Sequence, residues 1–171
     1  SNAAFESVYL NRMEPVGQLA EVQRLVLRNR LEAANALVDP RPEVIAKELA
    51  AMASNTRDID TQWAKYVATE LTTEEAQLVK AFEASRSRFV AEGFKPLQDA
   101  LQAGQVDEAK RINSERVEPL YDEVRKNINA LVALQFAEAK QAYQDSASRF
   151  ETTRALAIGV LVLSVAAAAL F

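Results

Sequence analysis

The stretch VDPRPE, at residues 38–43, places Pro40 and Pro42 directly after a long run of helix-favouring sequence. Proline has no backbone N–H to donate and its ring collides with the preceding helical turn, so a helix usually ends before it. The hydrophobic residues on both sides of this stretch recur with a helical period. We therefore expect one helix over residues 4–38 and a second over residues 43–69.

Two further interruptions divide the rest of the chain. In ELTTEE, residues 70–75, a threonine (Thr72 or Thr73) followed by Glu75 is typical of the start of a helix. In AGQVDE, residues 103–108, Gly104 is expected to turn the chain. These breaks predict a third helix that ends near residue 102 and a fourth that begins near residue 106.

Four helices of this length are predicted to lie side by side. At 1.5 Å per residue they would span roughly 40–70 Å, and each must bury its apolar stripe against the others. Short connections, near residues 39–42, 71–73 and 103–106, make consecutive helices antiparallel. The predicted fold is all-α, an up-down-up-down antiparallel four-helix bundle. Kinks or local breaks are expected at three prolines inside the helical patterns: Pro15, Pro96 and Pro119.

The chain ends on TTRALAIGVLVLSVAAAALF, residues 152–171, in which residues 155–171 carry no charge. A bilayer span needs about 20 apolar residues, so this run is slightly short. A buried core helix is the alternative, but it would need a matching apolar partner. We expect the fourth helix to continue into a truncated transmembrane segment. The predicted domains are residues 1–3, SNA, left from a cleaved expression tag, residues 4–154 as the bundle, and residues 155–171 as the start of the membrane helix.

Composition argues against several classes of function. The 20 Lys and Arg residues against 24 Asp and Glu give a net charge of −4, which does not favour a nucleic-acid partner. The sequence has no Cys and no His, so thiolate chemistry and the commonest general base and metal ligand are absent. A di-metal bundle would need Glu-x-x-His ligands. We expect no enzyme, no catalytic residue, no metal site and no cofactor.

The segments VYLNRMEPVGQLAEVQRLVLRNRLEAANAL, residues 8–37, and LQAGQVDEAKRI, residues 101–112, together with the terminal apolar helix, resemble a known family. They are similar to the periplasmic sensor domains of bacterial methyl-accepting chemotaxis receptors, in the aspartate-receptor-like class. The resemblance implies a homodimer through the first and fourth helices, a location in the periplasm at the inner membrane, and signalling through a transmembrane helix. Sensor histidine kinases carry similar domains.

Helical wheels indicate a lower polar layer inside the bundle. Arg86 falls within the apolar stripe of the third helix, and Thr56 falls within that of the second. No acidic partner for Arg86 is evident, and guanidinium pairs well with carboxylate, so a bound organic anion could supply the missing charge. A structural ion pair, or a side chain that reaches the surface, is the alternative. Gln23 and Phe89 are predicted to lie at about the same level.

An upper layer, nearer the distal turns, is predicted from Arg30, Asn113 and Ser114, with Arg28 at its edge. For Arg28 a solvated helix face is the simpler interpretation. In the resembling receptors the ligand lies between the first and fourth helices at the dimer interface, and their small hydroxyl residue aligns with Ser114. The spacing of the family's arginines does not fit Arg24, Arg28 and Arg30 together.

The sequence therefore supports three hypotheses in order. The first is a sensor domain for a small organic anion, either a di- or tricarboxylate or an amino acid. The second is a bundle that senses through a partner protein or serves as a dimeric spacer. The third, a helical enzyme or metal-binding bundle, is weakened by the absence of histidine.

Overall fold

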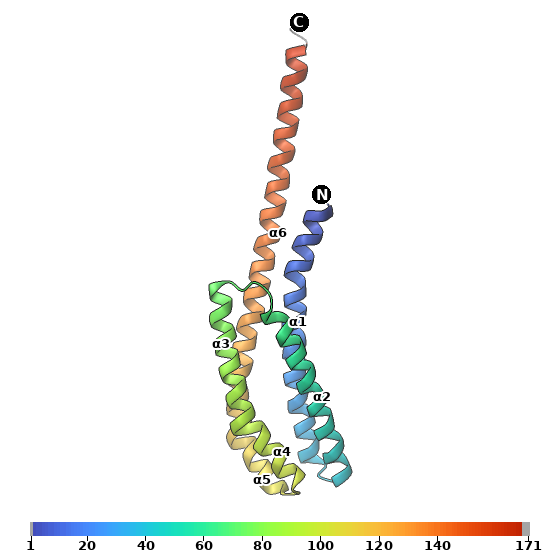
Figure 1. The fold of residues 1–171 in the computed structure, drawn as a ribbon, viewed down its shortest axis with the longest axis vertical. Coiled ribbons are helices and arrows are strands. Elements are labelled where there is room, and N and C mark those ends of the chain that lie inside the picture. Colours follow the sequence, from blue (N-terminus) through green and yellow to red (C-terminus); the bar gives the residue numbers. More distant parts are fainter. Residues whose placement is uncertain (1, 169–171) are drawn as a thin grey trace.

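The computed structural model describes the backbone of residues 2–168 and the side chains of residues 14–145, 148, 149 and 152. Four rods run along the bundle, and consecutive rods are antiparallel (Figure 1). The first two are single helices, whereas the third and fourth are each divided by a π-helical turn. In chain order the elements are α1 (Asn2–Val38), α2 (Pro42–Val67), α3 (Thr73–Arg88), η1 (Phe89–Phe94), α4 (Lys95–Gln102), α5 (Val106–Ile112), η2 (Asn113–Val117) and α6 (Glu118–Ala168).

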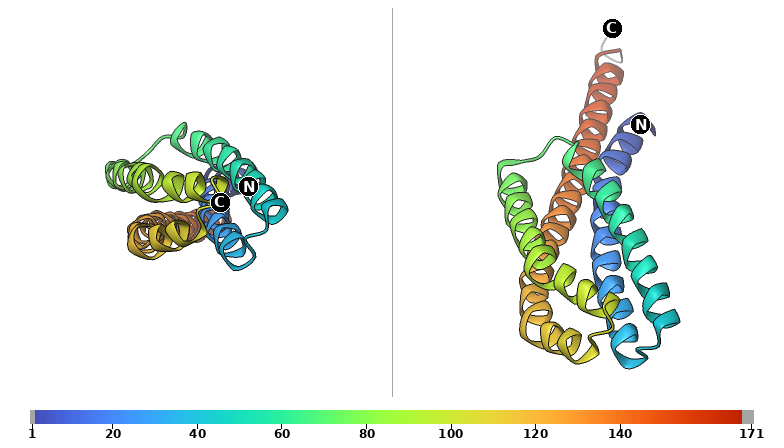
Figure 2. Two further views of the ribbon diagram at one scale, coloured as in Figure 1. Left: turned by 90° about the horizontal axis from the view of Figure 1, so that it is seen from below. Right: turned by 60° about the horizontal axis from the view of Figure 1, so that its bottom comes forward.

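The rods are arranged as two pairs. Helix α1 packs along α2, and α3 packs along α6, while the contact between α1 and α6 joins the pairs. Figure 2 shows the two pairs end-on, with α1 and α2 on one side and α3 and α6 on the other. The predicted all-α four-helix bundle is confirmed, and residues 2–168 contain no strand.

Each predicted break has its local cause in the structure. Arg41 precedes α2 with extended backbone angles, and Pro42 occupies the first turn, where its missing N–H costs nothing. Thr72 caps α3, and its reciprocal bonds with Glu75 form a capping box. Gly104 adopts a φ of 70°, a left-handed conformation that suits glycine at the turn into α5.

The prolines act differently from one another. Helix α1 continues through Pro15, so the predicted local break there is wrong. Pro96 and Pro119 each lie two residues after the end of a π-helical turn, so the regular α-helical pattern is disturbed next to both prolines, although the rods continue through them. Immediately before these prolines, the Lys95 N–H donates to the carbonyl of Val90 and the Glu118 N–H to that of Asn113. These bonds reach five residues back, which is the π-helical pattern.

Helix α6 extends well beyond the other rods and continues to Ala168 (Figure 1). The predicted continuation of the fourth helix into residues 155–168 therefore holds for the backbone, and residues 169–171 lie outside the described residues. Within the described part of the chain, no helix is both long enough and apolar enough to cross a membrane.

Large side chains bridge the space between α2 and α3. The ring centroids of Trp63 and Phe82 lie 4.6 Å apart, and the Trp63 indole donates to a Glu83 carboxylate oxygen at 3.0 Å. Tyr66 is fully buried beside this pair and donates its hydroxyl to Glu75. Burial and the neighbouring Glu75 carboxylate raise the pKa of Tyr66, so its hydroxyl stays protonated.

Two carboxyl groups are buried together between α1 and α2. Glu32 is 8% exposed and Glu48 is 4% exposed, and Arg28 and Lys47 contact them at 3.2 and 3.5 Å. A hydrogen bond from Glu48 lowers the pKa of Glu32, whereas the same bond, followed by burial, raises the pKa of Glu48. The two pKa values move apart because adjacent buried carboxylates repel each other, so Glu48 releases its proton less readily than Glu32 does.

This pair predicts a pH dependence of stability that one substitution removes. The stabilising contribution of Glu48 is complete below the ordinary glutamate pKa of about 4.3 and is lost as pH rises through its raised folded-state pKa. Glu48→Gln keeps a donor for Glu32 without a titrating proton. We expect its free energy of unfolding to fall less than that of the parent between acid and neutral pH, as measured by urea denaturation at several pH values. Glu43→Gln, on an exposed position of the same helix, is the control. A parallel pH profile for the parent and Glu48→Gln would contradict the assignment.

Candidate functional site

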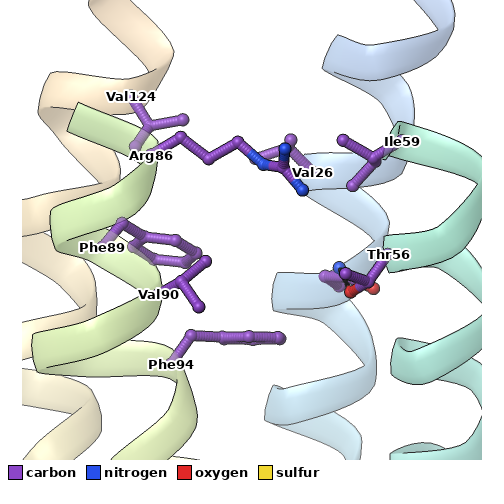
Figure 3. A pocket seen from close by; sticks show the side chains of 9 residues that line it. Val26, Thr56, Ile59, Arg86, Phe89, Val90, Phe94 and Val124 are labelled. Atoms are coloured by element: carbon purple, nitrogen blue, oxygen red, sulfur yellow. Dashed lines mark hydrogen bonds between the residues drawn. The ribbon is translucent and has the colours of Figure 1, made fainter. Parts of the chain in front are cut away.

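A small cavity lies at the centre of the bundle, between the two pairs of rods. Its volume is about 20 Å³, enough for roughly one water molecule. Figure 3 shows the Arg86 side chain reaching across from α3, with Val26, Ile59 and Thr56 on the opposite side. All four rods contribute to the lining, which consists of Val26, Asn29, Thr56, Ile59, Arg86, Phe89, Val90, Phe94 and Val124.

Arg86 has a partner that the sequence did not reveal. Its guanidinium donates to the Asp60 carboxylate on α2 at 2.6 Å, which corrects the expectation that its charge is uncompensated. The Arg86 side chain is only 21% exposed, whereas that of Asp60 is 60% exposed. The cation is thus largely withdrawn from water while its partner remains largely hydrated.

The wall opposite Arg86 is built from two hydrogen-bonded polar residues. The Thr56 hydroxyl donates its proton to the Met52 carbonyl at 2.8 Å and accepts from Asn29 Nδ2 at 3.4 Å. Asn29 is 5% exposed, and its Oδ1 has no hydrogen-bond partner among the described residues. Buried amide oxygens are seldom left unpaired, so this atom marks the cavity as a place that can accept a donor.

The π-helical turn η1 supplies the apolar wall. Phe89 and Phe94 stand five residues apart, and their rings stack with centroids 5.4 Å apart. One turn of a π-helix contains about this many residues, so both side chains project to the same side. Figure 3 shows Phe89, Val90 and Phe94 following one another along this wall.

The structure therefore brings together three members of the predicted lower layer. Thr56, Arg86 and Phe89 all line the cavity. Gln23 does not belong to this lining, because it extends toward α6, where its amide donates to Asn129 at 2.5 Å.

Two members of the predicted upper layer meet through an acidic residue. Glu118 accepts a hydrogen bond from Asn113 at 3.1 Å and lies 3.9 Å from the Arg30 guanidinium. Arg30 also lies over the Tyr121 ring, 4.6 Å from its centroid. A protein carboxylate and an aromatic face thus already compensate the Arg30 charge.

Ser114 and Arg28 lie apart from that group. The Ser114 hydroxyl is exposed and bonds to the carbonyls of Lys110 and Arg111 on its own rod. Arg28 is exposed and pairs with Glu32, as described above. The structure therefore gives Arg28 a structural partner beside the buried carboxyl pair.

The helical wheels missed the lining residues Asn29 and Phe94, and they missed Asp60, which lies outside the lining and pairs with Arg86. Asn29 follows Val26 by three positions, and Asp60 follows Thr56 by four, so both carried a helical-face signal in the sequence. Phe94 carried no such signal, because the π-helical turn inserts an extra residue and shifts the phase of every wheel drawn at 100° per residue.

No group of three or more acidic, His or Cys side chains in the described part of the chain is arranged to hold a metal ion. The chemistry that the cavity offers is binding: one guanidinium, one free amide oxygen and an apolar surround.

Comparisons with known proteins agree with this architecture. A solved structure described as the periplasmic sensor domain of a sensor histidine kinase matches with a TM-score of 0.68 and 19% sequence identity, over 85% of this chain and 96% of that chain. The comparison with curated proteins found no match. Residues 1–139 match the family described as Tar ligand binding domain homologue. The four-helix bundle is thus a sensor domain, and the chain belongs to the family of Tar ligand-binding domain homologues.

Proposed function

We propose that this chain is the periplasmic sensor domain of a bacterial chemotaxis receptor in the inner membrane, and that it binds a small organic anion in the cavity beside Arg86. The observation that carries the proposal is the Arg86 guanidinium, largely buried at the edge of a cavity and paired with one well-hydrated carboxylate. The family of ligand-binding domains to which the chain belongs supports a sensory role.

An entering carboxylate could replace Asp60 at little cost. The Asp60 carboxylate is 60% exposed, so water would solvate it well once a ligand carboxylate had replaced it. A ligand carboxylate that reaches Arg86 from inside the cavity would form a charge-assisted pair, bidentate in its best geometry. In the apolar surround of Phe89 and Val124 that pair is stronger than the same pair in water.

The position of the cavity supports a route for signalling. Its lining comes from α1, α2, the third rod and α6, so a ligand that contracts or widens it changes the spacing of all four rods. A ligand can shift an equilibrium only by binding two states unequally. We propose that the resulting movement of α6 passes along that helix into residues 155–171, which would enter the membrane.

A second copy of this chain is the proposed partner for an apolar stripe on α1. Leu27 and Leu31 are each 58% exposed, and Val38 on the same helix is 85% exposed. Phe136 and Tyr143 on α6 are exposed as well, seven residues apart along one helix face. We propose that the homodimer forms through these first and fourth rods, with the upper residues Arg28, Arg30, Asn113 and Ser114 near the interface.

The Arg86 site predicts a specific loss of binding. We expect Arg86→Gln to weaken the binding of organic anions by about 10- to 100-fold, which corresponds to a lost charge-assisted bond of about 1.5–3 kcal/mol. Isothermal titration calorimetry with a panel of mono-, di- and tricarboxylates and amino acids measures the change.

Arg88→Gln is the matched control, because Arg88 lies two residues further along the rod, is half exposed and pairs with Glu92 and Glu123. It should bind like the parent. If affinity survives in Arg86→Gln but is lost in Arg30→Gln or Ser114→Ala, the ligand occupies the upper layer and the proposed cavity site is wrong.

The proposed dimer predicts that a charge on α1 separates the copies. Burying a leucine contributes about 2 kcal/mol, and a twofold interface counts it twice, so Leu31→Glu should raise the dimer dissociation constant by at least about 100-fold. Sedimentation velocity on protein ending at residue 154 avoids association through the apolar tail. Ala53→Glu, an exposed position on α2, should dimerise normally. Equal dimerisation of both variants would exclude this face as the interface.

A further inference from the structure

The cavity has a single charged lining residue. Of the nine described residues that form it, Arg86 is a cation, Asn29 and Thr56 are neutral and polar, and the others are apolar. A second ligand carboxylate would therefore face Val, Ile and Phe side chains with no cation to pair with. Leaving a charge unpaired in such a setting costs several kcal/mol, so this lining disfavours dicarboxylates and tricarboxylates.

The orientation of the Asn29 amide is fixed by its neighbour. Thr56 has one hydroxyl proton, and it is donated to the Met52 carbonyl. Thr56 can therefore only accept from Asn29, which turns Nδ2 toward Thr56 and leaves Oδ1 as the free group. Asn29 thus offers the cavity an acceptor, and the complementary ligand group is a donor.

We propose that the ligand of this cavity is a hydroxylated monocarboxylate with an apolar body, whose carboxylate pairs with Arg86 and whose hydroxyl donates to Asn29 Oδ1. The inference rests on the proposed anion-binding function and names the substrate class of the same site.

A neutral hydroxyl fits the acceptor better than an ammonium group. An ammonium would bring a full positive charge to a wall that carries no acidic residue among the lining residues, and it would lie in the same cavity as the Arg86 cation. Both effects raise the cost of burial. A hydroxyl satisfies Asn29 Oδ1 without adding charge.

The walls favour a compact body between the two polar ends. Phe89 and Phe94 present stacked rings at an interplanar angle of 22°, and Val26, Ile59 and Val124 complete the apolar surface. The free cavity holds only about 20 Å³, so binding requires the rods to part. Short or flat acids demand the smallest opening.

The test uses pairs of acids that differ by one hydroxyl: butanoate with 3-hydroxybutanoate, and benzoate with 3-hydroxybenzoate. Calorimetry on the full chain should show that the hydroxylated member of at least one pair binds about 3- to 10-fold more tightly than its parent, the range expected for one neutral hydrogen bond. Succinate and citrate should bind more weakly than that member. The pair in which the hydroxyl group improves affinity more shows whether the ligand has an aliphatic or an aromatic body.

Asn29→Leu removes the acceptor at similar side-chain volume, and the ratio within the better pair should fall to about 1. Asn55→Leu is the matched control. Asn55, on α2, is buried like Asn29 and has an unpaired Nδ2, but it does not line the cavity. That variant should keep the parent ratio. Circular dichroism establishes that each variant is folded, and the ratios measured on the unaltered protein test the proposal even if Asn29→Leu unfolds.

The outcomes separate this inference from the function on which it rests. If anions bind and Arg86→Gln abolishes their binding, but the hydroxyl brings no gain or citrate binds most tightly, the ligand class proposed here is wrong while the anion-sensing function stands. If none of the acids in either panel binds the unaltered protein, the sensing of organic anions itself is contradicted.

Discussion

Two prolines set the geometry on which the site depends. Pro96 and Pro119 cannot donate a backbone hydrogen bond, and their rings would meet the carbonyls of residues 92 and 115 in a regular helix. In both rods the preceding turn widens to the π-helical pattern, and residues 92 and 115 lie inside the widened turns. The rods therefore continue without breaking, but each gains one residue per turn at the level of the cavity. The stacked Phe89 and Phe94 wall is a direct consequence of that extra residue.

The two widened turns also lie against each other. A Cβ placed on Gly93 would come within 3.4 Å of the Val117 Cα, so the absence of a side chain there lets η1 approach η2 closely. In the same turn, the ring centroid of Phe89 lies 6.3 Å from that of Tyr121, and the Arg30 guanidinium lies over the Tyr121 ring. A ligand that displaced Phe89 would therefore act, through packed side chains, on both the fourth rod and the Arg30 group. Dense packing transmits such a displacement because the interior has little room to absorb it.

Much of the bundle could be predicted from the sequence, because the signals are local. VDPRPE, the Thr72 capping box and Gly104 each end or begin a helix through the backbone chemistry of a few neighbouring residues. The site was predicted only in part. Thr56 lies on α2, which has no π-helical turn, and Arg86 precedes η1, so a regular wheel holds at both positions and both line the cavity as expected. Phe94 lies beyond that shift of phase. The Arg86–Asp60 pair depends on the distance between two rods, and the orientation of Gln23 depends on its contact with Asn129 on α6. The spacing of residues along one helix predicts neither of these contacts between rods.

Two polar groups at the cavity destabilise the ligand-free protein. Asn29 Oδ1 is buried without a partner, and Arg86 is held largely out of water by a carboxylate that is itself mostly solvated. An apolar residue at position 29 and a leucine at position 86 would pack the same space with fewer penalties, since an unsatisfied buried polar atom costs about 1–3 kcal/mol. Such costs become useful in a sensor, because a ligand that relieves them binds the relieved state more tightly than the free one. That difference in affinity is the quantity that moves an equilibrium between two arrangements of the rods. The same polar atoms that destabilise the ligand-free bundle would therefore allow a bound acid to shift the equilibrium between two positions of α6.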